Sequence, residues 1–168
     1  MVVKTGNEEA SAQRSGAPLR AHVLIIEGRF YTHIADLLVE GAIAELEARG
    51  VTYTRLTVPG ALEIPQVLAT AVGARAAGRM SFDGAIALGC VIRGETAHYD
   101  IVVNNANHWL MDVAVHNDAP VGNGVLTVDT EAQAIARATG GRKGKGGDAA
   151  RACLALIEIK RAFWGHKA

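Results

Sequence analysis

Four short apolar runs, each followed by a stretch of helical periodicity, constrain the fold of this 168-residue chain most strongly. The apolar runs predict strands at residues 21–27, 52–58, 82–88 and 121–128. The periodic stretches predict helices at residues 32–49, 64–77, 98–116, 130–138 and 148–164. Alternating strands and helices form a parallel sheet with helices on both faces and right-handed crossovers. We therefore expect an α/β protein: a three-layer α/β/α sandwich with a four-stranded parallel sheet, in one domain.

Helix signals mark several of these boundaries. Gly50 stops the first helix, Pro65 fits the first turn of the second, and Thr130 with Gln133 forms a capping-box pattern. The glycine-rich segment 140–147 predicts a loop, and Asp148 is expected to cap the last helix. Residues 1–18 are polar and predict a disordered N-terminal tail, which leaves residues 19–168 as the folded domain.

The charge balance narrows the class of partner. Seventeen Lys and Arg residues balance seventeen Asp and Glu residues, so the chain gives no electrostatic case for nucleic acid or an anionic membrane. Residues 1–18 lack the apolar core of a signal peptide, and no apolar run reaches the length of a membrane span. Cys90 and Cys153 lie far apart in apolar surroundings, which favours free thiols in a reducing compartment. We expect a cytoplasmic protein.

Residues able to bind a ligand follow the first two strands, at the edge where open α/β sheets bind ligands. Phe30 is either a core aromatic or a ring that stacks on a planar ligand. Segment 59–65 is either a plain turn into a helix or a place where backbone amides approach a ligand. In the second interpretation Glu63 accepts hydrogen bonds from ligand hydroxyl groups.

Titratable and hydroxyl side chains are concentrated in segment 89–100, which leads into the third helix. Its sequence is Gly-Cys-Val-Ile-Arg-Gly-Glu-Thr-Ala-His-Tyr-Asp. Amides and the Thr96 hydroxyl at a helix N-terminus can bind phosphate, and Glu95 is expected to point away from such an anion. His98 is either a surface residue or a proton carrier, since histidine titrates near neutral pH. A fourth group of candidate residues is expected at the same edge of the sheet: Asn123, Arg137 and Lys145. The two basic residues are either solvated charges or contacts for an anion.

Several common site types are excluded. The glycine-rich segment lacks the order of a nucleotide P-loop, and no G-x-G-x-x-G follows the first strand. Four of the six histidines have no cysteine or carboxylate partner at metal-ligand spacing, so we expect no metal; these four are His33, His98, His108 and His116.

Four segments together resemble the 6,7-dimethyl-8-ribityllumazine synthase family: GRF, VPGALEIP, LGCVIRGETAHYD and GVLTVDTEAQAIARA. The resemblance covers residues 19–164, and the pairing of VPGA-x-EIP with VIRG-x-T-x-H-[YF]-D is highly specific. It implies a flavodoxin-like fold and a transferase that acts in the penultimate step of riboflavin biosynthesis. Such an enzyme condenses 5-amino-6-(D-ribitylamino)uracil with 3,4-dihydroxy-2-butanone 4-phosphate, releases phosphate and water, and needs no cofactor.

The resemblance also implies residue roles. His98 would be the catalytic acid/base, and Arg137 would clamp the phosphate, with Glu95 and Thr96 at the phosphate end. The ring of the ribitylaminouracil would stack on Phe30 and contact the backbone of Cys90, Val91 and Ile92. Its ribityl chain would be held by Ala61, Leu62 and Glu63. Asn123 and Lys145 would also contact this substrate.

The chain departs from the family pattern at several places. Asn123 stands where relatives often carry an aromatic that reaches the neighbouring subunit's substrate, and Leu62 also replaces a common aromatic. Tyr31 replaces a frequent Asn. The family forms pentamers, often assembled into 60-subunit icosahedral shells, with each active site between two subunits. Because segment 140–147 lacks the form that accompanies shells, we expect a free homopentamer, with the shell as the alternative and a riboflavin synthase as downstream partner.

Two other functions stay open. One is a non-catalytic module of the same fold that binds a flavin or lumazine, against which the presence of His98 and Arg137 argues. The other is a flavodoxin-like signalling domain, which would need an acidic pocket after the first strand and a phosphorylatable Asp after the third. Cys90, Val91 and Ile92 occupy the latter place.

Overall fold

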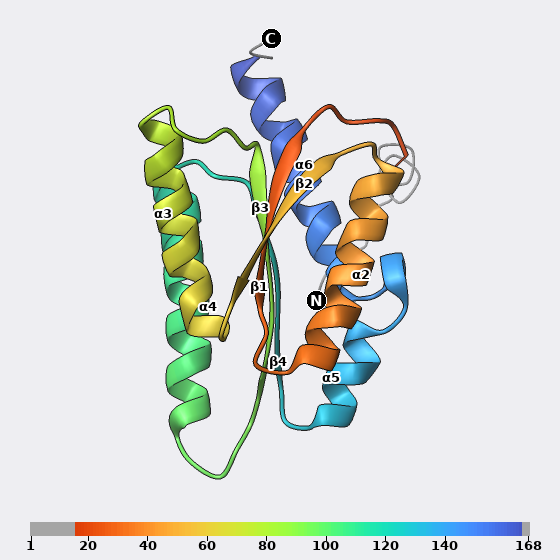
Figure 1. Ribbon diagram of the computed structural model, residues 1–168, viewed down its shortest axis with the longest axis vertical. Helices are drawn as coiled ribbons and strands as arrows, with labels where there is room; N and C mark the ends of the chain where they lie inside the picture. The colour runs from red at the N-terminus through yellow and green to blue at the C-terminus, as the bar shows by residue number, and fades with distance from the viewer. Residues whose placement is uncertain (1–15, 166–168) are drawn as a thin grey trace, which may run out of the picture.

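The computed structural model describes residues 16–165. Four strands and five α-helices alternate along this part of the chain (Figure 1). The strands are β1 (His22–Gly28), β2 (Thr52–Val58), β3 (Gly84–Ile92) and β4 (Val121–Val128). The helices are α2 (Thr32–Ala48), α3 (Ile64–Ala76), α4 (His98–His116), α5 (Glu131–Ala138) and α6 (Lys145–Trp164), with short 3-10 turns η1 (Ala61–Glu63) and η2 (Gly141–Lys143).

The sheet is parallel throughout, in the order β2-β1-β3-β4. Helices α3 and α4 cover one face, and α2, α5 and α6 cover the other (Figure 1). This arrangement confirms the predicted α/β/α sandwich. All four strand-to-helix connections leave the sheet at its carboxyl edge, at the bottom of Figure 1.

The central strands β1 and β3 are buried on both faces. Along β1, Val23 and Ile25 pack into the core beneath α2 and α6, whereas Leu24 and Ile26 pack beneath α3 and α4. This alternation follows the two-residue period of a strand. Burying each such aliphatic side chain stabilises the fold by about 1.5–3 kcal/mol.

Strand β3 differs from its predicted range of residues 82–88. It begins at Gly84 and continues to Ile92, so Cys90, Val91 and Ile92 belong to the strand rather than to a loop. The extension occurs because β4 continues alongside, pairing Cys90 with Leu126 and Ile92 with Val128. Smaller differences are a one-residue shift of β1 and helix ends one residue earlier at Ala48 and Ala76.

The glycine-rich segment also differs from its prediction as a loop. Helix α6 begins at Lys145, so Asp148 lies inside its first turns and does not cap it. A Cβ atom on Gly146 would lie 1.9 Å from the carbonyl oxygen of Leu38, and one on Gly147 would lie 2.1 Å from that of Arg142. Gly146 therefore allows close packing of α6 on α2, and Gly147 allows close packing of α6 on η2, so these glycines do not serve as a flexible linker.

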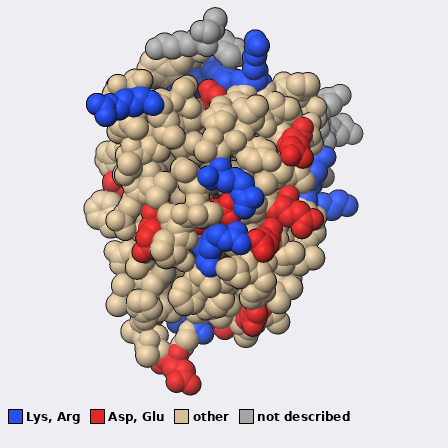
Figure 2. Space-filling model, viewed as in Figure 1, with Lys and Arg blue, Asp and Glu red and all other residues tan. Residues whose placement is uncertain are grey.

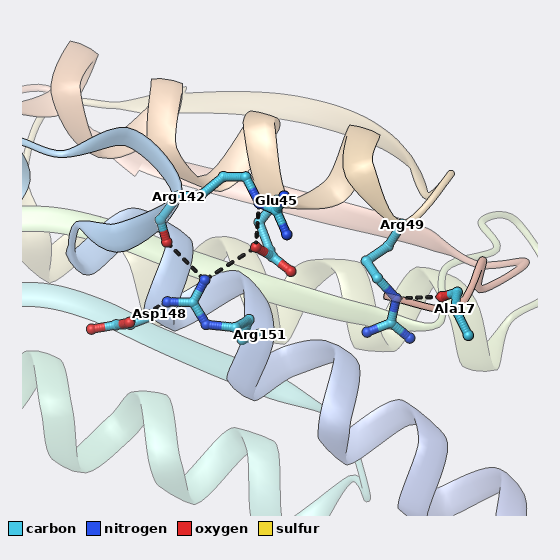
Figure 3. A network of polar contacts seen from close by, with 6 residues as sticks. All are labelled: Ala17, Glu45, Arg49, Arg142, Asp148 and Arg151. Carbon is cyan, nitrogen blue, oxygen red and sulfur yellow. Dashed lines mark hydrogen bonds and ion pairs between the residues drawn. The ribbon is translucent and has the colours of Figure 1, made fainter. Parts of the chain in front are cut away.

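A buried carboxylate holds this segment in place (Figure 3). Glu45 in α2 has no exposed surface, and its Oε2 accepts hydrogen bonds from Arg142 Nε at 2.9 Å and Arg151 Nη1 at 3.1 Å. Arg151 also donates to the carbonyl oxygen of Arg142 at 2.7 Å. The two guanidinium groups thus join η2 and α6 to α2.

Most of the predicted tail, residues 1–15, lies outside the described residues. Within the described part, the carbonyl oxygen of Ala17 accepts a hydrogen bond from the buried Arg49 at 2.5 Å, and the Leu19 amide donates to the Arg49 carbonyl at 2.8 Å. None of the helices between residues 16 and 165 combines the length and apolar character needed to cross a membrane.

Candidate active site

A pocket of about 410 Å³ opens at the carboxyl edge of the sheet. The β1–α2 loop, the β2–α3 connection and the β3–α4 connection each contribute part of its wall. The lining residues are Phe30, Tyr31, Pro59, Gly60, Ala61, Leu62, Glu63, Cys90, Val91, Ile92, Gly94, Thr96, His98, Tyr99 and Val102. The structure thereby brings together nine of the thirteen residues predicted from sequence: Phe30, Ala61, Leu62, Glu63, Cys90, Val91, Ile92, Thr96 and His98.

Phe30 presents an aromatic ring to this pocket. The residue is 74% exposed, so it is not a core aromatic. The ring of Tyr31 meets it edge-on, with centroids 5.0 Å apart and planes at 71°. One broad face of Phe30 can therefore receive a planar ligand, because offset or stacked rings attract through dispersion and their quadrupoles.

The second wall comes from η1 and the turn before it. The Gly60 amide donates a hydrogen bond to Glu63 Oε2 at 2.9 Å, which fixes the carboxylate at the start of α3. A Cβ atom on Gly28 would lie only 3.0 Å from the carbonyl carbon of Gly60, so a glycine lets the end of β1 approach the turn after β2. Glu63 keeps further acceptor capacity for ligand hydroxyl groups.

The end of β3 forms the floor of the pocket. The Cys90 side chain is buried, and burial, with a smaller contribution from the Glu131 carboxylate, raises the pKa of its thiol to about 11. Cys90 is therefore protonated at neutral pH and is not a nucleophile. Val91 and Ile92, which follow it along β3, also line the pocket.

His98 is the first residue of α4, and its exposed side chain lines the pocket. The backbone amide of His98 donates a hydrogen bond to the Thr96 hydroxyl oxygen at 3.4 Å. The Thr96 hydroxyl can still donate its own hydrogen to a ligand oxygen. Amides at a helix start and a hydroxyl donor suit an anionic ligand group. An imidazole beside them suits proton transfer.

The charge of the pocket is unusual for an anion site. Among the described residues that line it, none is Lys or Arg, and Glu63 carries the single carboxylate. The nearby Arg93 points to other partners: its Nε lies 3.0 Å from Asp129 Oδ1, and its guanidinium lies 4.1 Å above the Tyr99 ring. On the face drawn in Figure 2, positive and negative side chains are interspersed, with no large patch of one sign.

Four predicted site residues lie outside the pocket. Asn123 is the third residue of β4, not beyond its end, and donates a hydrogen bond to Asn107 of α4 at 2.8 Å. Arg137 is in the last turn of α5 and donates to the Gln133 carbonyl at 3.1 Å. Lys145, the exposed first residue of α6, and the exposed Glu95 do not line the pocket either. Asn123, Arg137 and Lys145 therefore do not join Phe30 and His98 around the pocket of one chain.

The thirteen predicted residues leave out four side chains that line the pocket, those of Tyr31, Pro59, Tyr99 and Val102. Tyr31 directly follows Phe30, and Tyr99 and Val102 lie in the first turns of α4. Helical spacing could have predicted Val102, because it lies four residues after His98 and residues four apart share a helix face. Within residues 16–165, no group of three His, Cys, Asp or Glu side chains is arranged to hold a metal ion.

A parallel sheet in the order 2-1-3-4 with a ligand pocket at its carboxyl edge defines a flavodoxin-like α/β protein. A sequence model described as 6,7-dimethyl-8-ribityllumazine synthase matches residues 20–161. The chain belongs to the 6,7-dimethyl-8-ribityllumazine synthase family.

Relatives agree with this assignment along nearly their whole length. A protein named 6,7-dimethyl-8-ribityllumazine synthase 1 from Rhodopseudomonas palustris is 55% identical over 141 residues, 84% of this chain and 86% of the relative. The 6,7-dimethyl-8-ribityllumazine synthase of Agrobacterium fabrum is 51% identical over 87% of this chain and 99% of its own. That of Azorhizobium caulinodans is 50% identical over 95% of this chain and 98% of its own.

Proposed function

We propose that this protein condenses 5-amino-6-(D-ribitylamino)uracil with 3,4-dihydroxy-2-butanone 4-phosphate to give 6,7-dimethyl-8-ribityllumazine, phosphate and water. The observation that carries the proposal is the joint presence of Phe30, Glu63 and His98 around one pocket at the carboxyl edge. An aromatic face, a hydroxyl acceptor and a proton carrier match a substrate with a planar ring, a polyhydroxyl chain and an amine.

The roles of these residues follow from their chemistry. Phe30 stacks on the pyrimidine ring, the backbone of Cys90 to Ile92 reads its edge, and Glu63 accepts hydrogen bonds from the ribityl hydroxyls. Imine formation, loss of phosphate, enolisation and ring closure each move a proton, and His98 serves as the carrier. Both substrates are reactive, so holding them in register contributes a large part of the acceleration.

A neighbouring subunit completes the site. A phosphate ester carries up to two negative charges, yet the pocket of one chain offers no Lys or Arg among its described lining residues. Arg137 of a neighbour supplies the phosphate clamp, because a guanidinium binds oxyanions through two parallel hydrogen bonds. Lys145 and Asn123 of the same neighbour approach the ring, and Glu95 and Thr96 flank the phosphate end.

We infer a homopentamer, in which the pocket of one chain meets a different patch of the next, as cyclic symmetry requires. Exposed apolar side chains on α4 support assembly, since a helix of a monomer would place polar residues there; these are Ile101, Trp109, Met111 and Val115. A 60-subunit shell is the alternative, and sedimentation velocity distinguishes the two by particle mass.

The direct test mixes the protein with both substrates and follows lumazine absorbance together with phosphate release. Stoichiometric formation of both products supports the enzyme. Tight lumazine binding without turnover supports instead a non-catalytic module of the same fold. We further propose a cytoplasmic location and a downstream riboflavin synthase that consumes the lumazine.

A further inference from the structure

Glu27, near the end of β1, is a carboxylate with no exposed surface. Its Oε1 accepts a hydrogen bond from Arg55 Nε at 2.6 Å, and its Oε2 accepts from Arg55 Nη2 at 3.1 Å and Arg29 Nη1 at 2.7 Å. Arg55 is on the neighbouring edge strand β2, whereas Arg29 is in the loop that carries Phe30. A buried carboxylate is costly to desolvate, so it persists only where its partners are well placed.

Arg29 reaches in two directions. Its Nη1 holds Glu27 at the end of β1, and its Nη2 donates to Asp36 Oδ1 in α2 at 2.6 Å. The Arg29 amide also donates to the Val58 carbonyl at 2.9 Å. One side chain thus bridges the strand before the loop and the helix after it, and Phe30 lies inside this bridge.

Phe30 directly follows Arg29 on this loop. Because the residue is 74% exposed, the Phe30 ring has little packing to hold it, and its aromatic neighbour Tyr31 belongs to the same loop. The backbone that carries the ring must therefore be held by other contacts. Arg29, the preceding residue, makes three of them: with Glu27, Asp36 and Val58.

We propose that Arg29 is a positioning residue, and that the Glu27–Arg29–Asp36 bridge holds the Phe30 ring in the orientation that receives the pyrimidine. This inference rests on the proposed function for the identity of the ligand. Arg55 shares Glu27 but lies outside the Phe30 loop, so it anchors the carboxylate without setting the ring.

The two arginines allow a matched comparison of Arg29→Lys with Arg55→Lys. Each change keeps the positive charge and removes the planar fork, and each affects the same carboxylate. We expect Arg29→Lys to raise KM for the ribitylaminouracil about threefold to tenfold, the loss that a misplaced aromatic contact gives. Its kcat at saturation and its KM for the butanone phosphate should stay near wild type, as should all constants of Arg55→Lys.

Hydrogen exchange measured by mass spectrometry supplies a readout independent of turnover. Amides of residues 28–31 should exchange faster in Arg29→Lys than in Arg55→Lys, at equal melting temperature. Equal KM values and equal exchange in the two variants would overturn the inference, even with a fully active wild-type protein. A wild-type protein without turnover, in which only Arg29→Lys loosens residues 28–31, would overturn the proposed function and support the bridge.

Discussion

The Glu27 carboxylate of β1 accepts two hydrogen bonds from Arg55 of β2, of 2.6 and 3.1 Å. Burial raises the pKa of the Glu27 carboxyl, but hydrogen bonds and charges from Arg55 and Arg29 outweigh it, so the pKa lies below the ordinary 4.5. A group whose pKa falls on folding stabilises the protein above its ordinary pKa. That stabilisation is lost as the pH falls through the lowered value.

Glu27→Gln should therefore lower the free energy of unfolding at pH 7, by about 2 kcal/mol given that both arginines can regain water. Urea unfolding at one fixed protein concentration measures this difference. It should shrink as the pH falls below 4.5, because the wild-type carboxyl then takes up a proton. A difference that stays constant down to pH 3.5 would contradict the role of the Glu27 charge.

His98→Ala should lower the rate of lumazine formation by about tenfold to a thousandfold, a range at or below typical general acid–base contributions. His116→Ala is the matched control, since His116 ends the same helix and does not line the pocket. Steady-state rates with both substrates saturating measure the effect. Wild-type rates in His98→Ala would remove His98 from the mechanism.

Arg137→Ala should raise KM for the phosphorylated substrate, by about tenfold or more for the loss of a charge-assisted contact. KM for the ribitylaminouracil should change little. Arg79→Ala is the control, because Arg79 is exposed and lies between α3 and β3, away from the pocket. An equal rise of both KM values would indicate a general loss of structure instead.

Chains carrying His98→Ala and chains carrying Arg137→Ala should complement each other when they are unfolded together and refolded. In a ring with a site at each interface, about a quarter of random interfaces combine an intact His98 with a neighbour's intact Arg137. Activity should therefore exceed that of either variant alone. No gain in activity from mixed assemblies of confirmed composition would place both residues in the site of one chain.

Gly146→Ala should destabilise the fold by about 1–3 kcal/mol or more, since its Cβ would overlap the Leu38 carbonyl oxygen. Gly73→Ala is the matched control within α3, where a Cβ meets nothing within 4 Å. That change should stabilise by about 0.5–1 kcal/mol, because alanine favours helix. Thermal unfolding of both variants tests whether the glycine-rich segment is packed rather than mobile.

The local pattern of apolar residues predicts the alternating strands and helices, because both periods are set by residues close in sequence. It also predicts that the candidate site lies at the carboxyl edge of the sheet. The sequence does not predict that β3 continues to Ile92, because Gly89 is typical of a turn. The continuation depends on the pairing of Cys90 with Leu126, which lies in a strand far along the chain. The buried pairing of Glu27 with Arg55 spans 28 residues and leaves no local signal. The glycine-rich segment 140–147 predicts a loop because a sequence does not distinguish a glycine needed for close packing from one needed for a turn.

In the proposed assembly, the pocket's lack of Lys or Arg among its described lining residues would make turnover depend on protein concentration. With the clamp supplied by a neighbour, as proposed, a dissociated chain would keep its aromatic face and its histidine yet lose the contact for phosphate. Specific activity would then fall on dilution below the dissociation constant of the assembly, and phosphate-bearing substrate would restore it by favouring association.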